Sequence, residues 1–137
     1  MDITINNCLI SDSKDLIQID RVHTLLKSTY WANNRDINII QKSIENSLCF
    51  GIYKDNIQVG FARCVTDFAT SYWLCDVVID DNYRGHGLGK ALMKAITEHD
   101  DLKSLQGILG TSNAHGLYEQ YGFIRDKDTF MRKRPIQ

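Results

Sequence analysis

A turn containing three glycines joins an apolar strand to an amphipathic helix in the middle of this chain. The strand ends in Val77-Val78-Ile79, the glycines stand at 85, 87 and 89, and the helix begins among them. Glycine lets the backbone adopt positive φ and approach a ligand closely, and the first N–H groups of a helix have no intrahelical acceptor. A helix start of this kind favours an anion. The segment therefore predicts a binding turn for a diphosphate.

Spacing separates this turn from two common nucleotide-binding loops. A nucleoside-triphosphate loop needs an earlier glycine and a hydroxyl after its Gly-Lys pair, but this chain has Arg84 and Ala91 at those positions. A dinucleotide-binding loop needs its third glycine where Lys90 stands, and an acidic residue ending a second strand about 20 residues later. Neither pattern is met. The sequence of this turn is Arg-Gly-x-Gly-x-Gly, and it follows directly after a strand.

A second motif follows the glycine turn, at residues 111–123. It reads Thr-Ser-Asn-Ala-His-Gly-Leu-Tyr-Glu-Gln-Tyr-Gly-Phe. The two segments together resemble the acyl-coenzyme A loop and the Leu-Tyr-Glu-x-x-Gly-Phe signature of the GCN5-related N-acetyltransferases, the GNAT superfamily. The match covers residues from about 73 to 124. It implies an α/β fold in which a central mixed β-sheet is flanked by about four helices.

Hydrophobic periodicity along the chain predicts elements in the same order as that fold. Ser13 is placed to cap a helix whose apolar face includes Leu16, Ile19 and Val22. A tight turn at Lys54-Asp55-Asn56 predicts a hairpin. The expected elements are strand 2–7, the helix after Ser13, helix 36–46, strands 47–53 and 57–66, strand 71–79, helix 87–98, strand 105–110 parallel to 71–79, a helix from Asn113 to Gln120, and terminal strands at 123–124 and 130–132.

The resemblance assigns the binding site for the acyl-coenzyme A. In the family the pantetheine arm lies along the strand that corresponds to 71–79, and backbone at the positions of Val77 and Ile79 bonds it and stabilises the oxyanion. Arg84 or Lys90 would neutralise phosphate charge, and Asn113 matches an asparagine that bonds the pantetheine. The residues expected to bind the cofactor are Val77, Val78, Ile79, Arg84, Gly85, His86, Gly87, Leu88, Gly89, Lys90, Asn113 and Tyr118.

Tyr118 matches the tyrosine that in many family members protonates the departing thiolate. A phenol with an unperturbed pKa of about 10 is protonated at neutral pH and can serve as this acid. An amine must also lose a proton before it attacks, so a base is expected. Asp76 is the first candidate and Asp67 the second, acting directly or through water. Both have alternative interpretations, Asp67 as a turn residue and Asp76 as a structural or recognition carboxylate.

The acceptor is expected near the junction of the first two helices, a region that in this family closes over the acceptor. Tyr30 and Trp31 stand there as candidate pocket walls, and Arg35 as a candidate partner for an acceptor carboxylate. Asp67 and Trp73, with Phe68, are further candidates. The alternative interpretation of the aromatic residues is ordinary core packing.

Length and composition narrow the class of protein. The 137 residues predict one domain, 1–137. A net charge of −1 argues against binding of nucleic acid through bulk electrostatics. Without a signal pattern or a long apolar run, a cytoplasmic protein with no membrane association is expected. The residues Cys8, Cys49, Cys64 and Cys75 show no metal or redox spacing, so they are expected to be buried free thiols, with no metal bound.

The sequence thus predicts an N-acetyltransferase that moves an acetyl group from acetyl-CoA to a primary amine of a small molecule or peptide. The amine would attack directly in a ternary complex, since no Cys-His pair suggests a covalent intermediate. A catalytically silent acyl-CoA sensor is the main alternative, and a nucleic-acid module is a third. A toxin that acylates aminoacyl-tRNA would require a more basic surface. A homodimer is left open, because small members of the family often pair.

Overall fold

The computed structural model describes residues 1–136. It contains the strands and helices β1 (Asp2–Ile5), β2 (Cys8–Ser11), α1 (Ile19–Lys27), α2 (Ile37–Glu45), β3 (Leu48–Lys54), β4 (Ile57–Thr66), β5 (Ser71–Ile79), α3 (Leu88–Thr97), β6 (Gln106–Leu109) and α4 (His115–Glu119). Short 3₁₀ turns at Lys14–Leu16 and Asp81–Tyr83 precede α1 and the glycine turn. The six strands form one sheet in the order β1-β2-β3-β4-β5-β6. The predicted mixed sheet with flanking helices is confirmed.

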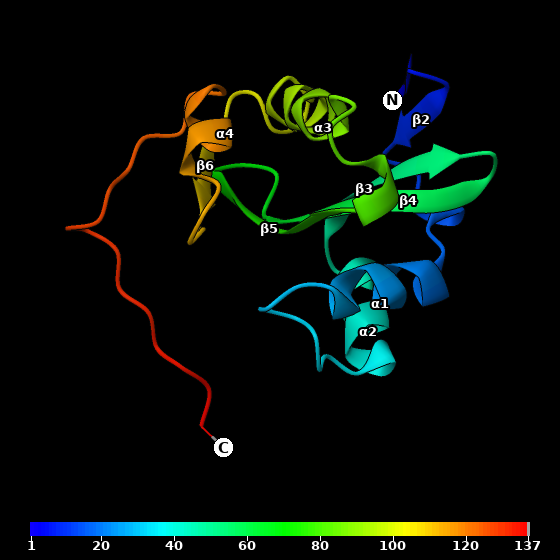
Figure 1. Ribbon diagram of the computed structural model, residues 1–137. Helices are drawn as coiled ribbons and strands as arrows, with labels where there is room; N and C mark the ends of the chain where they lie inside the picture. Colours follow the sequence, from blue (N-terminus) through cyan, green and yellow to red (C-terminus); the bar gives the residue numbers. More distant parts are fainter. Residues whose placement is uncertain (137) are drawn as a thin grey trace.

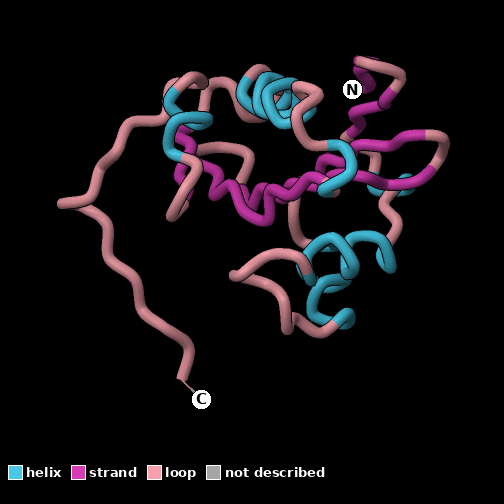
Figure 2. Tube along the Cα trace, in the orientation of Figure 1, coloured by secondary structure: helices cyan, strands magenta, loops and turns pink. Residues whose placement is uncertain are grey.

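The sheet is the middle layer of three. Helices α1 and α2 cover one face and α3 and α4 the other (Figures 1 and 2). Alternate residues of the central strands enter the two cores: Phe50 and Ala62 pack on the α3 side, whereas their neighbours Cys49 and Phe61 pack on the α1–α2 side. Burial of large side chains such as Phe50 contributes roughly 1.5–3 kcal/mol each.

The strands are antiparallel neighbours except for β5 and β6, which are parallel. The parallel pair is short, because β6 pairs only with Ser71–Leu74. Farther along β5, Cys75 to Ile79 have no strand beside them on the β6 side within residues 1–136. The carboxyl-terminal half of β5 therefore has an open edge facing α3 and α4.

A bulge in β5 begins this open segment. Opposite β4, Cys75 faces Arg63 and Val78 faces Phe61, so Asp76 and Val77 share the position opposite Ala62. Asp76 adopts a left-handed φ of 57°, a conformation that aspartate tolerates better than most residues. The bulge turns the strand and brings the Asp76 side chain to the face covered by α1 and α2.

Three predictions about the N-terminal part have mixed outcomes. The hairpin β3–β4 is confirmed, with Asp55 and Asn56 at positive φ. Strand 2–7 is wrong, because Asn6 and Asn7 form a left-handed turn that splits the segment into the hairpin β1–β2. The Ser13 cap is also wrong: its side chain makes no capping bond, Leu16 belongs to a 3₁₀ turn, and α1 begins at Ile19.

The C-terminal predictions differ most from the structure. Neither 123–124 nor 130–132 forms a strand, and the segment that follows α4 runs out from the body as an extended chain (Figure 1). Ile124 and Met131 are 87% and 94% exposed, so this segment buries little apolar area. Its many charged residues favour hydration over packing. The helix from Asn113 is shorter than predicted, since α4 starts at His115.

Candidate active site

An open cleft of about 2240 Å³ follows the unpaired half of β5. The glycine turn, the loop before α4, α4 itself and part of the C-terminal segment form its other walls. Ligand pockets commonly measure 300–1,000 Å³, so this cleft has room for an elongated ligand and a second molecule. Its floor brings together segments that lie far apart in the sequence.

The glycine turn forms one end of the cleft. Gly85 and Gly87 have φ of 80° and 77°, and Gly87 is the residue that precedes α3. The first bond inside the helix runs from the Ala91 N–H to the Gly87 oxygen at 3.0 Å, so earlier N–H groups are left for another acceptor. A Cβ at either glycine would meet no atom within 4 Å. The turn is thus an open, amide-lined concavity suited to an anion.

The predicted cofactor residues of this turn divide into two groups. The residues that line the cleft are Arg84, Gly85, Gly87, Leu88 and Gly89. His86 and Lys90 are exposed and do not line it. Their backbone oxygens have structural partners instead: His86 accepts a bond from Asn6 at 2.9 Å, and Lys90 accepts one from Tyr121 at 3.0 Å. Arg84 pairs with exposed Asp81 at 3.0 Å, beside the turn.

Val77, Val78 and Ile79 form the adjoining wall. Their side chains do not share a face: Val77 and Ile79 pack toward α3, whereas Val78 enters the core under α1. These side chains are therefore part of the two cores, and the open edge presents backbone to the cleft. An extended ligand can bond such an edge as an additional strand.

Tyr118 lies on α4 and reaches the cleft from the opposite side. Its ring meets Phe123 edge to face, with centroids 6.1 Å apart. Burial raises the pKa of Tyr118, and the nearby Tyr30 phenol raises it further, so Tyr118 remains a protonated donor well above neutral pH. Asn113 lines the cleft but does not cap α4. Thr111 accepts bonds from the N–H groups of Asn113 and Ala114 instead, at 3.4 and 3.1 Å.

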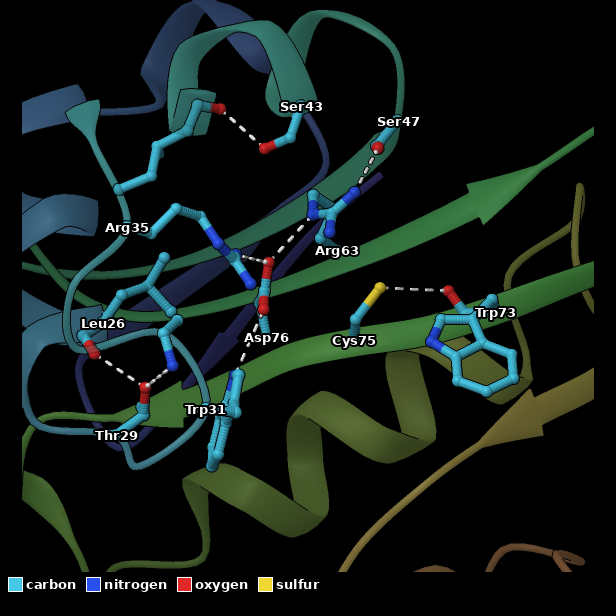
Figure 3. Close-up of polar contacts among 12 residues, drawn as sticks. Leu26, Thr29, Trp31, Arg35, Ser43, Ser47, Arg63, Trp73, Cys75 and Asp76 are labelled. Atoms are coloured by element: carbon cyan, nitrogen blue, oxygen red, sulfur yellow. Dashed lines mark hydrogen bonds and ion pairs between the residues drawn. The ribbon is translucent and has the colours of Figure 1, made fainter. Parts of the chain in front are cut away.

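Asp76 lies on the other face of β5 and is surrounded by donors (Figure 3). One carboxylate oxygen accepts from Arg35 at 2.8 Å and Arg63 at 2.9 Å, and the other accepts from the Trp31 indole at 3.2 Å. Its side chain is 2% exposed. These three donors enclose the carboxylate, which leaves it nearly inaccessible to an acceptor amine in the cleft. The geometry favours the structural interpretation of Asp76 over that of a general base.

Of the remaining candidates for the acceptor side, Tyr30 and Trp73 line the cleft and Asp67 does not. Tyr30 accepts a bond from Ser112 at 2.8 Å and lines the cleft, while Trp73 stacks on Phe130 with centroids 5.5 Å apart. Asp67 lies outside the cleft lining and closes its own turn, accepting from Thr70 and Ala69. These bonds hold the pKa of Asp67 well below its usual range, the Thr70 hydroxyl contributing most. Asp67 is a turn residue.

Sequence reasoning missed Arg63. The residue stands in a strand whose neighbours Ala62 and Cys64 are fully buried, and its guanidinium also donates to Ser47 at 3.1 Å. A charged residue inside an apolar strand needs a buried partner. That requirement was the signal available in the sequence, and Asp76 is the partner.

Comparisons with known proteins agree with this architecture. The profile of the acetyltransferase (GNAT) domain family matches residues 45–125, which is more than half of the chain. The chain belongs to the GNAT family. A crystal structure of a GNAT-family protein from Xanthomonas campestris pv. campestris is 38% identical, covers 96% of both chains and superposes with a TM-score of 0.90.

Two further proteins are similar to this chain. An uncharacterized N-acetyltransferase, ycf52-like, from Prochlorococcus marinus is 36% identical over 60% of this chain, but the match spans only 46% of that protein's length. A Clostridium acetobutylicum protein solved with acetyl-CoA is 14% identical, covers 93% of this chain and 95% of its own, and has a TM-score of 0.67. At that identity the likeness concerns the fold alone.

Other sequence-based expectations concern the cysteines, metals and membranes. Cys8, Cys49 and Cys64 are buried free thiols as predicted, and Cys75 is only half-buried. Among residues 1–136, no group of three or more His, Cys, Asp or Glu side chains is placed to hold a metal ion. The helices within that range are all too short or too polar to cross a bilayer.

Proposed function

We propose that this GNAT protein is an N-acetyltransferase that uses acetyl-CoA to acetylate a primary amine of a small molecule or peptide. The observation that carries the proposal is the glycine turn at the start of α3, which opens into the same cleft as the free edge of β5 and the phenol of Tyr118. In this arrangement a diphosphate site, an extended binding edge and a proton donor follow one another. The acetyl-CoA in the Clostridium acetobutylicum relative agrees with that choice of co-substrate.

Binding of acetyl-CoA divides among three parts of the cleft. The N–H groups of the glycine turn hold the diphosphate, with Arg84 beside them. The open edge from Cys75 to Ile79 bonds the pantetheine arm, helped by Asn113. Backbone N–H groups near Val77 then polarise the thioester carbonyl and stabilise the oxyanion that forms during attack.

Acetyl transfer proceeds by direct attack. The amine nitrogen bonds to the thioester carbonyl carbon, the C–S bond breaks, and Tyr118 gives its proton to the departing sulfur and recovers one from water. The amine loses its own proton to water in the open cleft, because Asp76 is committed to its two arginines. Burial raises the pKa of the Cys75 thiol to about 11, so this cysteine is a weak nucleophile at neutral pH, which is consistent with a mechanism without an acyl-enzyme.

The experiment that tests this function measures coenzyme A release from acetyl-CoA with a panel of primary amines. Amine-dependent release together with the N-acetylated product supports the proposal. Calorimetric binding of acetyl-CoA without release on any amine would instead support the acyl-CoA sensor. Failure of both binding and release would remove both functions.

Replacing Gly87 with valine is expected to weaken coenzyme A binding by at least about tenfold, or roughly 1.4 kcal/mol. Valine at a φ of 77° is strained by about 1–2 kcal/mol, and its side chain would enter the space that the diphosphate needs. Isothermal calorimetry with coenzyme A measures the change. Gly116→Ala is the matched control, because Gly116 also has no atom within 4 Å of an added Cβ but lies in α4 outside the cleft lining. Equal affinities in wild type and Gly87→Val would contradict the placement of the diphosphate.

A further inference from the structure

The arginine–aspartate cluster formed by Arg35, Arg63 and Asp76 has an excess of positive charge. Two guanidinium groups share one carboxylate oxygen, at 2.8 and 2.9 Å. Asp76 is nearly inaccessible, whereas the side chains of Arg35 and Arg63 keep 24% and 14% exposure. One carboxylate cannot neutralise two such cations, so the cluster has a formal charge of +1.

Arg35 has donors to spare. Within residues 1–136 its guanidinium has a single partner, Asp76, whereas Arg63 donates to both Asp76 and Ser47. Arg35 also lines the cleft. Its planar fork of N–H groups can bind one carboxylate and still present further donors to a second. Asp76 fixes the orientation of this fork.

The cluster lies next to the place where the acetyl group is transferred. Asp76 directly precedes Val77, whose backbone polarises the thioester in the proposed mechanism, and the aromatic rings of Tyr30 and Trp31 stand beside it on the loop before α2. The cleft wall made by residues 28–35, 63–65 and 72–79 contains no acidic side chain other than Asp76. A purely cationic amine therefore finds no available anion there.

We propose that the acceptor carries a carboxylate close to its primary amine, as an amino acid does, and that Arg35 binds that carboxylate. The inference rests on the proposed function. Arg63 adds positive charge behind Arg35, and Asp76 is a positioning residue that holds both. Binding the carboxylate orients the neighbouring amine toward the thioester carbonyl, so recognition and alignment depend on the same contact.

The test compares amines with and without a carboxylate, and kcat/KM is expressed per concentration of deprotonated amine, because replacing the carboxylate also changes the pKa of the amine. Alanine, alaninamide and isopropylamine form one set, and β-alanine, β-alaninamide and propylamine form a second. In at least one set, the carboxylate compound should have a kcat/KM about 10- to 100-fold above its two neutral counterparts. 1-Aminoethylphosphonate separates recognition of a carboxylate from recognition of any anion: the proposal predicts that alanine is the better substrate.

Arg35→Gln should lower the kcat/KM for the preferred amino acid by about 10- to 100-fold, mainly by raising KM. The kcat/KM values of the amino acid and of its neutral counterpart should then be nearly equal. Arg35→Lys should recover part of the loss, because it restores charge without the fork. Lys42→Gln removes the same charge from an exposed position of α2 outside the cleft lining and should leave the ratio unchanged. Circular dichroism checks that each variant is folded.

Binding is measured separately from turnover, by calorimetry of each amine in the presence of coenzyme A. Carboxylate-selective binding that is lost in Arg35→Gln supports the inference even if no amine is acetylated. The absence of acetylation would contradict only the proposed enzymatic function. Equal or better kcat/KM for the neutral amines overturns the inference while acetylation stands. The inference is also overturned if no amino acid of the panel binds, or if the phosphonate is preferred.

Discussion

Tyr118→Phe is expected to lower kcat by about 100- to 1,000-fold, because it removes the proton donor for the departing thiolate. The ring and its edge-to-face contact with Phe123 remain, so stability and coenzyme A affinity should change little. Steady-state kinetics give kcat, and calorimetry gives the affinity. A fall in kcat at unchanged affinity is the expected signature of a group that acts in the transition state.

Tyr121→Phe is the matched control for that substitution. Tyr121 also lines the cleft, but its hydroxyl already donates to the Lys90 backbone oxygen at 3.0 Å. Its loss should cost about 1 kcal/mol of stability and leave kcat within a few-fold of wild type. Equal kcat values for Tyr118→Phe and wild type would remove Tyr118 from the mechanism.

The pH dependence of kcat/KM should follow the acceptor amine rather than Tyr118. Burial holds the pKa of Tyr118 above its usual value of 10, so the acid is lost only as pH rises beyond that point. Between pH 7 and pH 9 the rate should therefore increase as the amine loses its proton. A rate that falls within that interval would contradict the assignment of Tyr118 as the acid.

Asp76→Asn is expected to lower the free energy of unfolding by about 2–3 kcal/mol, because it leaves two partly buried guanidinium groups without their shared anion. Asparagine tolerates the left-handed φ of 57°. The substitution therefore removes the negative charge without adding backbone strain. For a chain of this size the melting temperature should fall by roughly 10 °C. Thermal and urea unfolding measure both quantities.

The exposed pair of Asp100 and Lys103 provides the control. Asp100 is 90% exposed, and Asp100→Asn should change stability by no more than about 0.5 kcal/mol. If Asp76→Asn instead retains wild-type stability and loses only kcat, Asp76 is a base and the structural interpretation fails. The same substitution thus decides between the two roles considered for this residue.

Local sequence signals predicted the strand β5 and the glycine turn that follows it. A strand's apolar run and the glycines after it act over a few residues, and the structure has β5 at the predicted bounds of 71–79 with left-handed Gly85 and Gly87. The hairpin β1–β2 also had a local signal, since consecutive Asn6 and Asn7 suit a left-handed turn. That signal was missed because a weak alternation ran across it.

The arginine–aspartate cluster depends on contacts between distant segments. The bulge at Asp76 is defined by how β5 pairs with β4. Arg35, which binds the Asp76 carboxylate, comes from the loop before α2. No local pattern specifies which charges meet there. The terminal strands at 123–124 and 130–132 failed for a related reason: alternation favours a strand, but a strand also needs a neighbouring edge to pair with.

The most direct test of the account follows the acetyl group itself. The protein is incubated with acetyl-CoA labelled isotopically in the acetyl group and with a metabolite extract, and mass spectrometry is applied to the small molecules, the peptides and the intact chain. We expect the label to appear as an N-acetyl group on an amine that also bears a carboxylate, with the protein unlabelled. Label retained covalently on the protein during turnover, or absent from every amine, would contradict it.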